Sequence, residues 1–518
     1  MHKLIFVLTM AVTLNAAIVE QSDITNVWSS HFVDFALVTD SSALLQYVGF
    51  YDKDRKMTIA QRNLSSKQWQ LKTLPVTTGW DSHDYISVAV DDSGYIHVSG
   101  NMHNVPLVYF RSSKPRSIDT FESLAMTGTN ETMVTYPMFI KGIAKGELYF
   151  QYRDNANSTS TILWNKYSVA TKKWTRLTTE GFFNTEGLYS AYMTNPVKGP
   201  DDYFHVVWMW RNTPTANTNH DLSHIRSKDL VNWETMNGTI VTLPIKQSTP
   251  GVVADPVDAG NGLINIAFGI GWDSQKRPVI NYHKYDKNAI SQRWNTRWEN
   301  GAWKIYQTSA WTSFKWSLDR TGTLGIDISG TPVKQDYSGR LVQEYQHVNF
   351  GSHMWVLDEQ TLQPLKDTLP ILIPGLDSLH KVTSTFAGMQ VHIKVDGDYY
   401  FRWETLPENQ DKARNPPLPD PTMLSVYKIT STTSTGTRTA PTVNKTSYHA
   451  IVQGSVVTID CMDETTLVEL FTLEGKRIGA SKRTGSIQQY FNLARGTYIY
   501  KIDNRYTTSP VVNKIIIH

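Results

Sequence analysis

Histidine, tyrosine and arginine side chains, which can exchange protons and bind anions, gather between residues 80 and 226. The segment WDSHDYISVAVDDSGYIHVSGNMHNVP carries His83 just ahead of one strand pattern and His103 just after the next. Strand ends and loops are where sites are usually built. We therefore expect His83 and His103 to act in chemistry. By contrast, His97 and His205 lie inside the alternating strands YIHVS and FHVVW and are expected to be structural.

The same stretch holds further candidates with aromatic, cationic or amide side chains. They are Tyr136 in TYPMF, Arg153 in YFQYRDN, Tyr192 in EGLYSAYM, and Arg211, Asn219 and His220 in WMWRNTPTANTNHDLSHIRS. A later segment, VINYHKYD, adds His283 and Tyr285. A single such residue in a strand usually serves packing, so the prediction depends on the group as a whole.

Eliminative cleavage of a uronate glycoside needs such a group. Arginine can neutralise the C6 carboxylate through a planar, bidentate fork, which makes the C5 proton removable. A neutral histidine or a deprotonated tyrosine can take that proton, and a tyrosine hydroxyl can protonate the leaving O4. The residues leave the assignment of base and acid between histidine and tyrosine open.

Glycoside hydrolysis would instead need two carboxylates facing the bond. The acidic residues of this stretch adjoin histidine or arginine, and we expect them to orient those side chains. They are Asp81, Asp84, Asp154 and Asp221.

Short alternating strands separated by turns must position these residues, since residues 24–429 show almost no amphipathic helix pattern. Strand-turn-aromatic endings recur roughly every 50–70 residues, the length of a four-stranded propeller blade with its loops. The endings lie at Trp69, Phe121, Trp174, Trp233, Trp303 and Trp355, with a last segment near Phe386–Trp403. The pattern predicts an all-β fold, a seven-bladed β-propeller over residues 18–430. A β-sandwich would show the alternation without this period.

The N-terminal segment indicates export. MHKLIFVLTMAVTLNAA has a basic start, an apolar run and small residues at its end, which is typical of a signal peptide over residues 1–17. No later stretch is apolar enough to span a membrane. A net charge of +3 does not indicate nucleic-acid binding, and the single cysteine, Cys461, excludes an intrachain disulfide.

Composition changes after residue 430. Residues 431–447 are rich in Ser and Thr and predict a linker. Residues 448–518 predict a small separate β-sandwich, in which VELFTLEGKRI, NLARGTYIYKI and NKIIIH resemble the C-terminal sorting domain of the type IX secretion system. The resemblance implies secretion or cell-surface display through that machinery. A carbohydrate-binding β-sandwich is the alternative.

The motifs of residues 80–235, with INYHKYD, resemble the BNR-4 type propeller family, which includes seven-bladed ulvan lyases. The resemblance implies an anionic polysaccharide substrate, with His83 and His103 as the paired histidines. Tyr136 and Arg153 would be the acid/base tyrosine and the carboxylate neutraliser. Tyr192, Arg211, Asn219, His220, His283 and Tyr285 would bind substrate.

A cofactor is not required for this chemistry, although family members can carry a structural zinc with a cysteine ligand. The propeller region has no cysteine. The resemblance therefore implies an altered or absent site, with His220 and His224 as candidate replacements and calcium as another structural ion to consider. The sequence does not identify the metal ligands.

Two other functions remain open on the same scaffold. One is a propeller hydrolase acting on rhamnose–glucuronate linkages, because fold-level similarity does not separate it from a lyase. The other is a non-catalytic sugar-binding propeller, which would need the aromatic and cationic cleft without the acid/base pair.

Overall fold

The computed structural model describes residues 14–517 apart from internal segments. Those left out are residues 157–160, 179, 322–323, 337–338, 369–375, 434–448, 454–455, 462–465, 473–476, 484–486, 493–495 and 505–510. Most of the predicted signal peptide and linker lies outside the described residues. The chain divides into two compact units, Met1–Ser434 and Thr435–His518, each of which is described by itself.

Strands make up nearly all of the regular structure, which confirms the all-β prediction. In the described residues the helices are short: η1 (Ser82–Asp84), η2 (Ala216–Thr218) and α1 (Asp377–His380). No described helix is both long and apolar enough to cross a membrane.

The described part of the first unit forms seven antiparallel sheets. The first holds β2 (Ala36–Asp40), β3 (Leu45–Tyr51), β4 (Lys56–Asn63) and β5 (Gln70–Thr77). The second holds β6 (Ile86–Val90), β7 (Ile96–Gly100), β9 (Tyr109–Ser112) and β10 (Phe121–Ser123). The third holds β8 (His103–Val105), β11 (Val134–Lys141), β12 (Leu148–Asp154), β13 (Thr161–Ser168) and β14 (Lys173–Arg176).

The next two sheets follow in chain order. The fourth holds β15 (Ser190–Met193), β16 (Val197–Lys198), β17 (Phe204–Arg211), β18 (Asn219–Ser227), β19 (Trp233–Glu234), β20 (Ile240–Val241) and β21 (Val253–Asp255). The fifth holds β22 (Gly269–Trp272), β23 (Pro278–Tyr285), β24 (Ser291–Glu299) and β25 (Ala302–Gln307).

The last two sheets complete the first unit. The sixth holds β26 (Ile328–Gly330), β27 (Lys334–Gln335), β28 (Leu341–His347), β29 (Gly351–Leu357) and β30 (Pro364–Thr368). The seventh holds β31 (Gln390–Asp396), β32 (Tyr399–Thr405), β33 (Thr422–Thr433) and the N-terminal strand β1 (Leu14–Val27).

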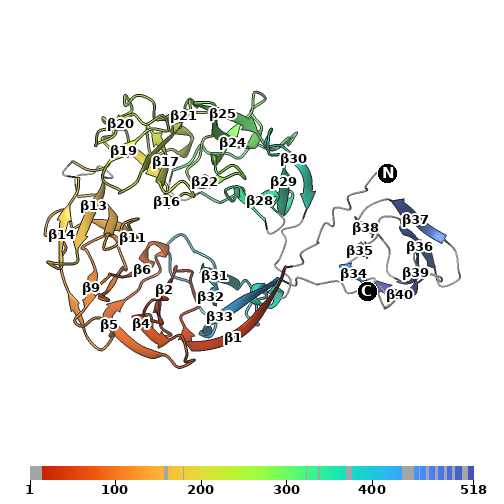
Figure 1. The fold of residues 1–518 in the computed structure, drawn as a ribbon, viewed down its shortest axis with the longest axis horizontal. Helices are drawn as coiled ribbons and strands as arrows, with labels where there is room; N and C mark the ends of the chain where they lie inside the picture. Colours follow the sequence, from red (N-terminus) through yellow and green to blue (C-terminus); the bar gives the residue numbers. More distant parts are fainter. Residues whose placement is uncertain are drawn as a thin grey trace, which may run out of the picture. The chain divides into compact units, whose positions relative to one another are not determined.

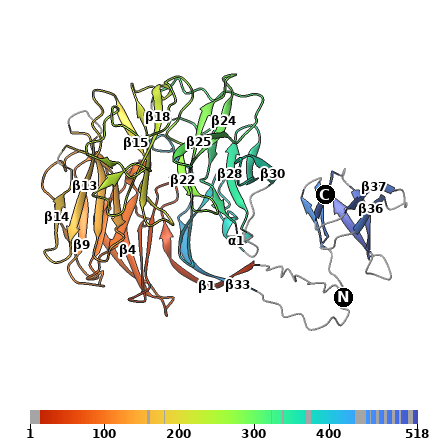
Figure 2. The same cartoon turned by 45° about the horizontal axis from the view of Figure 1, so that its top comes forward.

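Within the first unit the sheets follow one another around a ring (Figure 1). The inner strands of neighbouring sheets touch, as β2 does with β6 and β6 with β11. The seventh sheet joins the two ends of the unit, because β1 pairs with β33 from Leu14↔Thr433 to Val27↔Thr422. Figure 2 shows these two strands running side by side.

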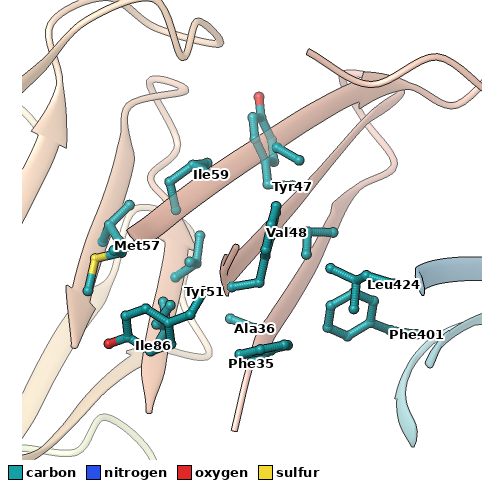
Figure 3. Packing of buried hydrophobic residues seen from close by; sticks show 14 of the residues in the cluster. Phe35, Ala36, Tyr47, Val48, Tyr51, Met57, Ile59, Ile86, Phe401 and Leu424 are labelled. Atoms are coloured by element: carbon teal, nitrogen blue, oxygen red, sulfur yellow. The ribbon is translucent and has the colours of Figure 1, made fainter. Parts of the chain in front are cut away.

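Apolar side chains fill the space between neighbouring sheets. One buried cluster joins the first sheet (Tyr47, Ile59), the second (Ile86) and the seventh (Phe401, Leu424), as Figure 3 shows. Flat and β-branched side chains suit such packing between pleated surfaces. The packed sheets hold the strand ends and loops that carry the candidate residues.

The second unit contains two antiparallel sheets in its described residues. One has β34 (His449–Gln453), β35 (Val456–Cys461) and β38 (Ile487–Asn492). The other has β37 (Arg477–Arg483), β36 (Thr466–Thr472), β39 (Gly496–Asn504) and β40 (Val511–Ile517).

Candidate active site

The two predicted histidines meet because they flank one antiparallel strand pair. His83 lies in η1, just before β6, and His103 begins β8, just after β7. Since β6 and β7 run antiparallel, with Ile86 opposite Gly100, the start of one strand and the end of the other lie together. The imidazole rings stack with their centroids 4.0 Å apart.

One carboxylate holds both rings. Asp81 Oδ1 lies 2.6 Å from His83 Nδ1, and Asp81 Oδ2 lies 2.6 Å from His103 Nδ1. Burial alone would raise the pKa of Asp81, but the hydrogen bonds from His103 and His83 outweigh it and the pKa is lowered. An ionised carboxylate only accepts, so each neutral ring carries its proton on Nδ1.

The other ring nitrogen of each histidine is therefore a proton acceptor. Among the described residues, none hydrogen-bonds to Nε2 of His83 or His103. A carboxylate that fixes the tautomer in this way leaves the Nε2 lone pair available as a base.

Tyr136 is presented by a bulge in the third sheet. On β11, Thr135 pairs with Arg153 and Met138 pairs with Gln151, so two residues, Tyr136 and Pro137, oppose Tyr152 alone. Tyr136 has a φ of 59°, in the left-handed region that bulky residues rarely adopt. Tyr136 is 36% exposed, and the centroid of its ring lies 5.5 Å from that of His83.

Arg153 lies against this tyrosine. Its guanidinium carbon stands 4.7 Å from the centre of the Tyr136 ring, and Nη2 lies 3.5 Å from the side-chain oxygen of Asn104. No described carboxylate forms an ion pair with Arg153. Its charge is thus available to an anion.

Arg211, at the end of β17 in the fourth sheet, is a second arginine that lies against a tyrosine ring. It donates to side-chain oxygens of Asn219 (2.7 Å), Asn265 (2.6 Å) and Tyr192 (3.3 Å), and its guanidinium lies 4.3 Å from the centre of the Tyr192 ring. It has no ion-pair partner within the described part of the chain. Burial lowers the pKa of Arg211 and raises that of Tyr192, so Tyr192 is held as a neutral phenol.

These residues line one cavity of about 520 Å³, large enough for a few sugar units. Its lining comes from strands of the third and fourth sheets and from loops of the first unit: Ser82, His83, Tyr85, His103, Tyr136, Arg153, Tyr189, Tyr192, Arg211, Pro214, Ala216, Asn265, Ile266, Leu324, Glu408, Gln410 and Asp411. All four predicted catalytic residues are among them, together with two predicted substrate-binding residues.

The remaining predicted residues lie elsewhere. Asn219 is buried and supports Arg211 from behind the cavity. His220 bonds Asp221 at 2.9 Å. His283 and Tyr285 are buried on β23, where their polar atoms bond backbone oxygens of Gly262 and Trp316. These four residues do not line the cavity.

The expectation that four acids orient neighbouring side chains holds for two of them. Asp81 holds the histidine pair and Asp221 bonds His220. Asp84 instead accepts from Thr78 and Gly79, and Asp154 accepts from Asn130 and Ala156. Alternation along β12 explains the Asp154 error, because successive residues point to opposite faces of a sheet.

His220 and His224 do not come together as metal ligands. His224 Nε2 lies 2.9 Å from Nδ1 of His205, whose other nitrogen lies 3.1 Å from Asp201. In the described residues, the one group of three or more potential ligands is Asp81, His83, His103 and Asp411, at the cavity.

Sequence reasoning missed the carboxylates of a distant loop. Glu408 and Asp411 lie between β32 and β33, more than 300 residues beyond His83, and both line the cavity. Burial and the nearby charge of Asp411 raise the pKa of Glu408. Their segment, ENQDKARNPP, carries no motif that would have singled them out.

Comparisons with known proteins agree with this architecture. A family model described as a BNR repeat-containing family member matches residues 45–311. The short isoform of an ulvan lyase from Alteromonas sp. (strain LOR) is 22% identical over 253 residues, which cover 43% of this chain and 45% of that protein. The chain thus spans about half the length of this relative.

Two solved structures share the fold. An ulvan lyase of polysaccharide lyase family PL25 aligns with a TM-score of 0.51 at 14% identity, covering 79% of this chain and 94% of that one. The polysaccharide lyase Uly1 aligns with a TM-score of 0.51 at 13% identity, covering 81% and 100%. The family match covers slightly more than half of the sequence, and the matched residues include the histidine pair, Tyr136, Arg153 and Arg211. This chain belongs to the BNR repeat-containing family.

Proposed function

We propose that this protein is a polysaccharide lyase that cleaves a uronate-containing sulfated polysaccharide, ulvan, by β-elimination. The observation that carries the proposal is the cavity itself: its lining combines two histidines with available Nε2 atoms and two arginines that have no carboxylate partner among the described residues. A related PL25 ulvan lyase has been solved bound to -[GlcA(1-4)Rha3S]-, which supports the choice of substrate.

The cavity residues suggest a division of labour. Arg153, with Arg211 in the same cavity, neutralises the C6 carboxylate of the uronate. Nε2 of His83 or His103 takes the C5 proton, since Asp81 occupies the other nitrogen of each ring. The C4–O4 bond then breaks, a C4–C5 double bond forms, and the Tyr136 hydroxyl gives its proton to O4.

A hydrolase is the second candidate, because Glu408 and Asp411 bring two carboxylates to the same cavity. Glycoside hydrolysis uses one carboxylic acid and one carboxylate, and the pKa of Glu408 is raised in the direction that suits an acid. The lyase is favoured because the histidines, Tyr136 and both arginines have no place in that mechanism.

Incubation with ulvan separates the candidates. The lyase yields 4,5-unsaturated uronate ends, read by ultraviolet absorbance, whereas hydrolysis yields products one water heavier by mass. We expect Tyr136→Phe to lower the rate by about 10²–10⁴, and Glu408→Gln to leave elimination measurable. His97→Ala, at a buried residue that bonds Tyr109, is the control and should alter stability more than kcat.

The opposite result would refute the lyase. Saturated products that disappear in Glu408→Gln, with normal turnover in Tyr136→Phe, would assign the cavity to hydrolysis. Unchanged polymer that still binds would assign it to a sugar-binding protein.

We further infer that each sheet of the first unit is one blade of a seven-bladed propeller. Residues 1–17 are proposed as a signal peptide, and residues 448–518 as a β-sandwich sorting domain read by the type IX secretion machinery. These proposals imply that the protein acts outside the cell or on its surface. Their support is the apolar start of the sequence and the resemblance of VELFTLEGKRI and NLARGTYIYKI to such sorting domains.

A further inference from the structure

The four side chains of Asp81, His83, His103 and Asp411 form a set suited to a transition-metal ion. One potential ligand atom from each lies within 4.8 Å of all the others. Two imidazole nitrogens and two carboxylate oxygens match the ligand types of four-coordinate zinc, whereas magnesium and calcium prefer oxygen alone.

The distances are near those that such an ion requires. His83 Nδ1 lies 2.6 Å from Asp81 and 3.9 Å from Asp411 Oδ2. Tetrahedral bonds of about 2.0–2.2 Å separate ligand atoms by roughly 3.3–3.5 Å. Binding would open the first contact and close the second, each by less than about 1 Å.

Asp411 contributes a negative charge as well as a carboxylate oxygen near the other three ligands. Its Oδ1 accepts from the backbone and the hydroxyl of Ser82, at 3.2 and 3.3 Å, while Oδ2 faces His83 beyond hydrogen-bond distance. Within this set of four residues, the carboxylates of Asp81 and Asp411 supply negative charge that a divalent cation would offset.

We propose that Zn²⁺ binds to Asp81, His83, His103 and Asp411 and switches the histidine pair off. In the metal-free pair each Nδ1 carries the proton and each Nε2 is a base. A metal on Nδ1 moves the remaining proton of each neutral ring to Nε2. Both rings then donate where the reaction needs them to accept. The inhibition rests on the proposed lyase function, whereas the metal site does not.

The test begins with binding, which needs no substrate. The full chain, freed of metal by a chelator, is titrated with ZnCl₂ in a calorimeter and with Co²⁺ by visible absorption. We expect one equivalent to bind and the Co²⁺ complex to show the intense bands of four-coordinate cobalt. Asp411→Asn should weaken zinc binding by about tenfold or more.

Asp367→Asn is the matched control, because Asp367 lies 3.1 Å from Nδ1 of His353, a second Asp–His pair outside the cavity. It should bind zinc as the wild type does. His103→Asn offers an independent removal of a ligand from β8 if Asp411→Asn fails to fold.

Activity on ulvan is then measured with and without zinc, each variant normalised to its own metal-free rate. Inhibition should follow occupancy, reverse with chelator and shift to higher zinc in Asp411→Asn. Wild-type affinity in both ligand variants, or failure of zinc to bind, would overturn the site. Activation by bound zinc would overturn the switch. Zinc binding by a protein that leaves ulvan intact would uphold the site and refute only the lyase.

Discussion

Asp81 is the residue on which both proposed bases depend, since it contacts Nδ1 of His83 and of His103 at 2.6 Å. An asparagine in its place presents one acceptor oxygen and an NH₂ donor, so it no longer holds both rings in the same tautomer. In a comparable Asp–His pair the same change lowers kcat by about 10⁴.

We therefore predict that Asp81→Asn lowers kcat by roughly 10²–10⁴ while KM changes little. Steady-state kinetics on ulvan measure both. Asp84→Asn is the control, because Asp84 bonds Thr78 and Gly79 rather than a histidine. Equal losses of kcat in the two variants would mean that Asp81 acts only through stability.

The role of positive charge in the cavity can be tested by changing Arg153. Lysine keeps the charge but loses the planar fork that binds a carboxylate, so Arg153→Lys should lose about 10²–10³ of kcat/KM. Arg111→Lys, which changes an arginine paired with Glu122 outside the cavity, should be near wild type. A fully active Arg153→Lys would show that Arg153 only packs against Tyr136.

At the scale of elements, the bulge in β11 decides where the Tyr136 ring points. Tyr136 and Pro137 share one partner residue on β12, and the left-handed φ of Tyr136 is one of the costs of the bulge. Such distortions persist where the surrounding structure holds them, and they often serve a site.

Deletion of Pro137 should restore regular pairing and turn the Tyr136 hydroxyl away from the histidines. We expect a loss of rate about as large as that of Tyr136→Phe, roughly 10²–10⁴, although the phenol remains. Pro137→Ala keeps two residues in the bulge and should retain most of the activity. Kinetics are compared with thermal unfolding, and a deletion variant that stays active would disprove the role of the bulge.

The sequence was sufficient to predict the parts of the site that are formed by residues close together in the chain. Asp81, His83 and His103 flank a single strand pair, and the motif around each is visible. The predicted aromatic endings agree with the strand order in part. Phe121, Trp174 and Trp303 lie on the edge strands β10, β14 and β25, whereas Trp233, Trp355 and Trp403 lie on β19, β29 and β32, which have a strand on either side.

The rest depends on packing between sheets. The sequence pattern predicted His283 and Tyr285 as substrate-binding residues. However, β23 lies between two other strands of the fifth sheet, and both side chains are buried. Asp411 reaches the cavity from the far end of the first unit, and the bulge at Tyr136 follows from the register of β11 on β12. No local sequence pattern encodes the position of Asp411 in the cavity or the bulge at Tyr136.

At the scale of the whole molecule, the proposed catalytic unit ends before the second unit begins. The boundary lies at Ser434/Thr435, and all cavity residues precede it. We predict that a chain ending at Pro441 keeps full activity on soluble ulvan, whereas one ending at Pro421 loses β33 and does not fold. Circular dichroism and turnover check both. A folded but inactive chain ending at Pro441 would give the second unit a part in catalysis.

The pairing of β1 with β33 has a consequence for when the cavity is completed during folding. Asp23 and Ser425, which bond across the two strands, are 402 residues apart in the chain. Contacts this distant form late, because the entropy of closing so long a loop must be overcome first. The loop carrying Glu408 and Asp411 leads directly into β33, so it reaches His83 only when the ring closes. A chain that has not yet paired β1 with β33 therefore lacks the part of the cavity wall that Glu408 and Asp411 provide, and we expect this wall to be placed late in folding.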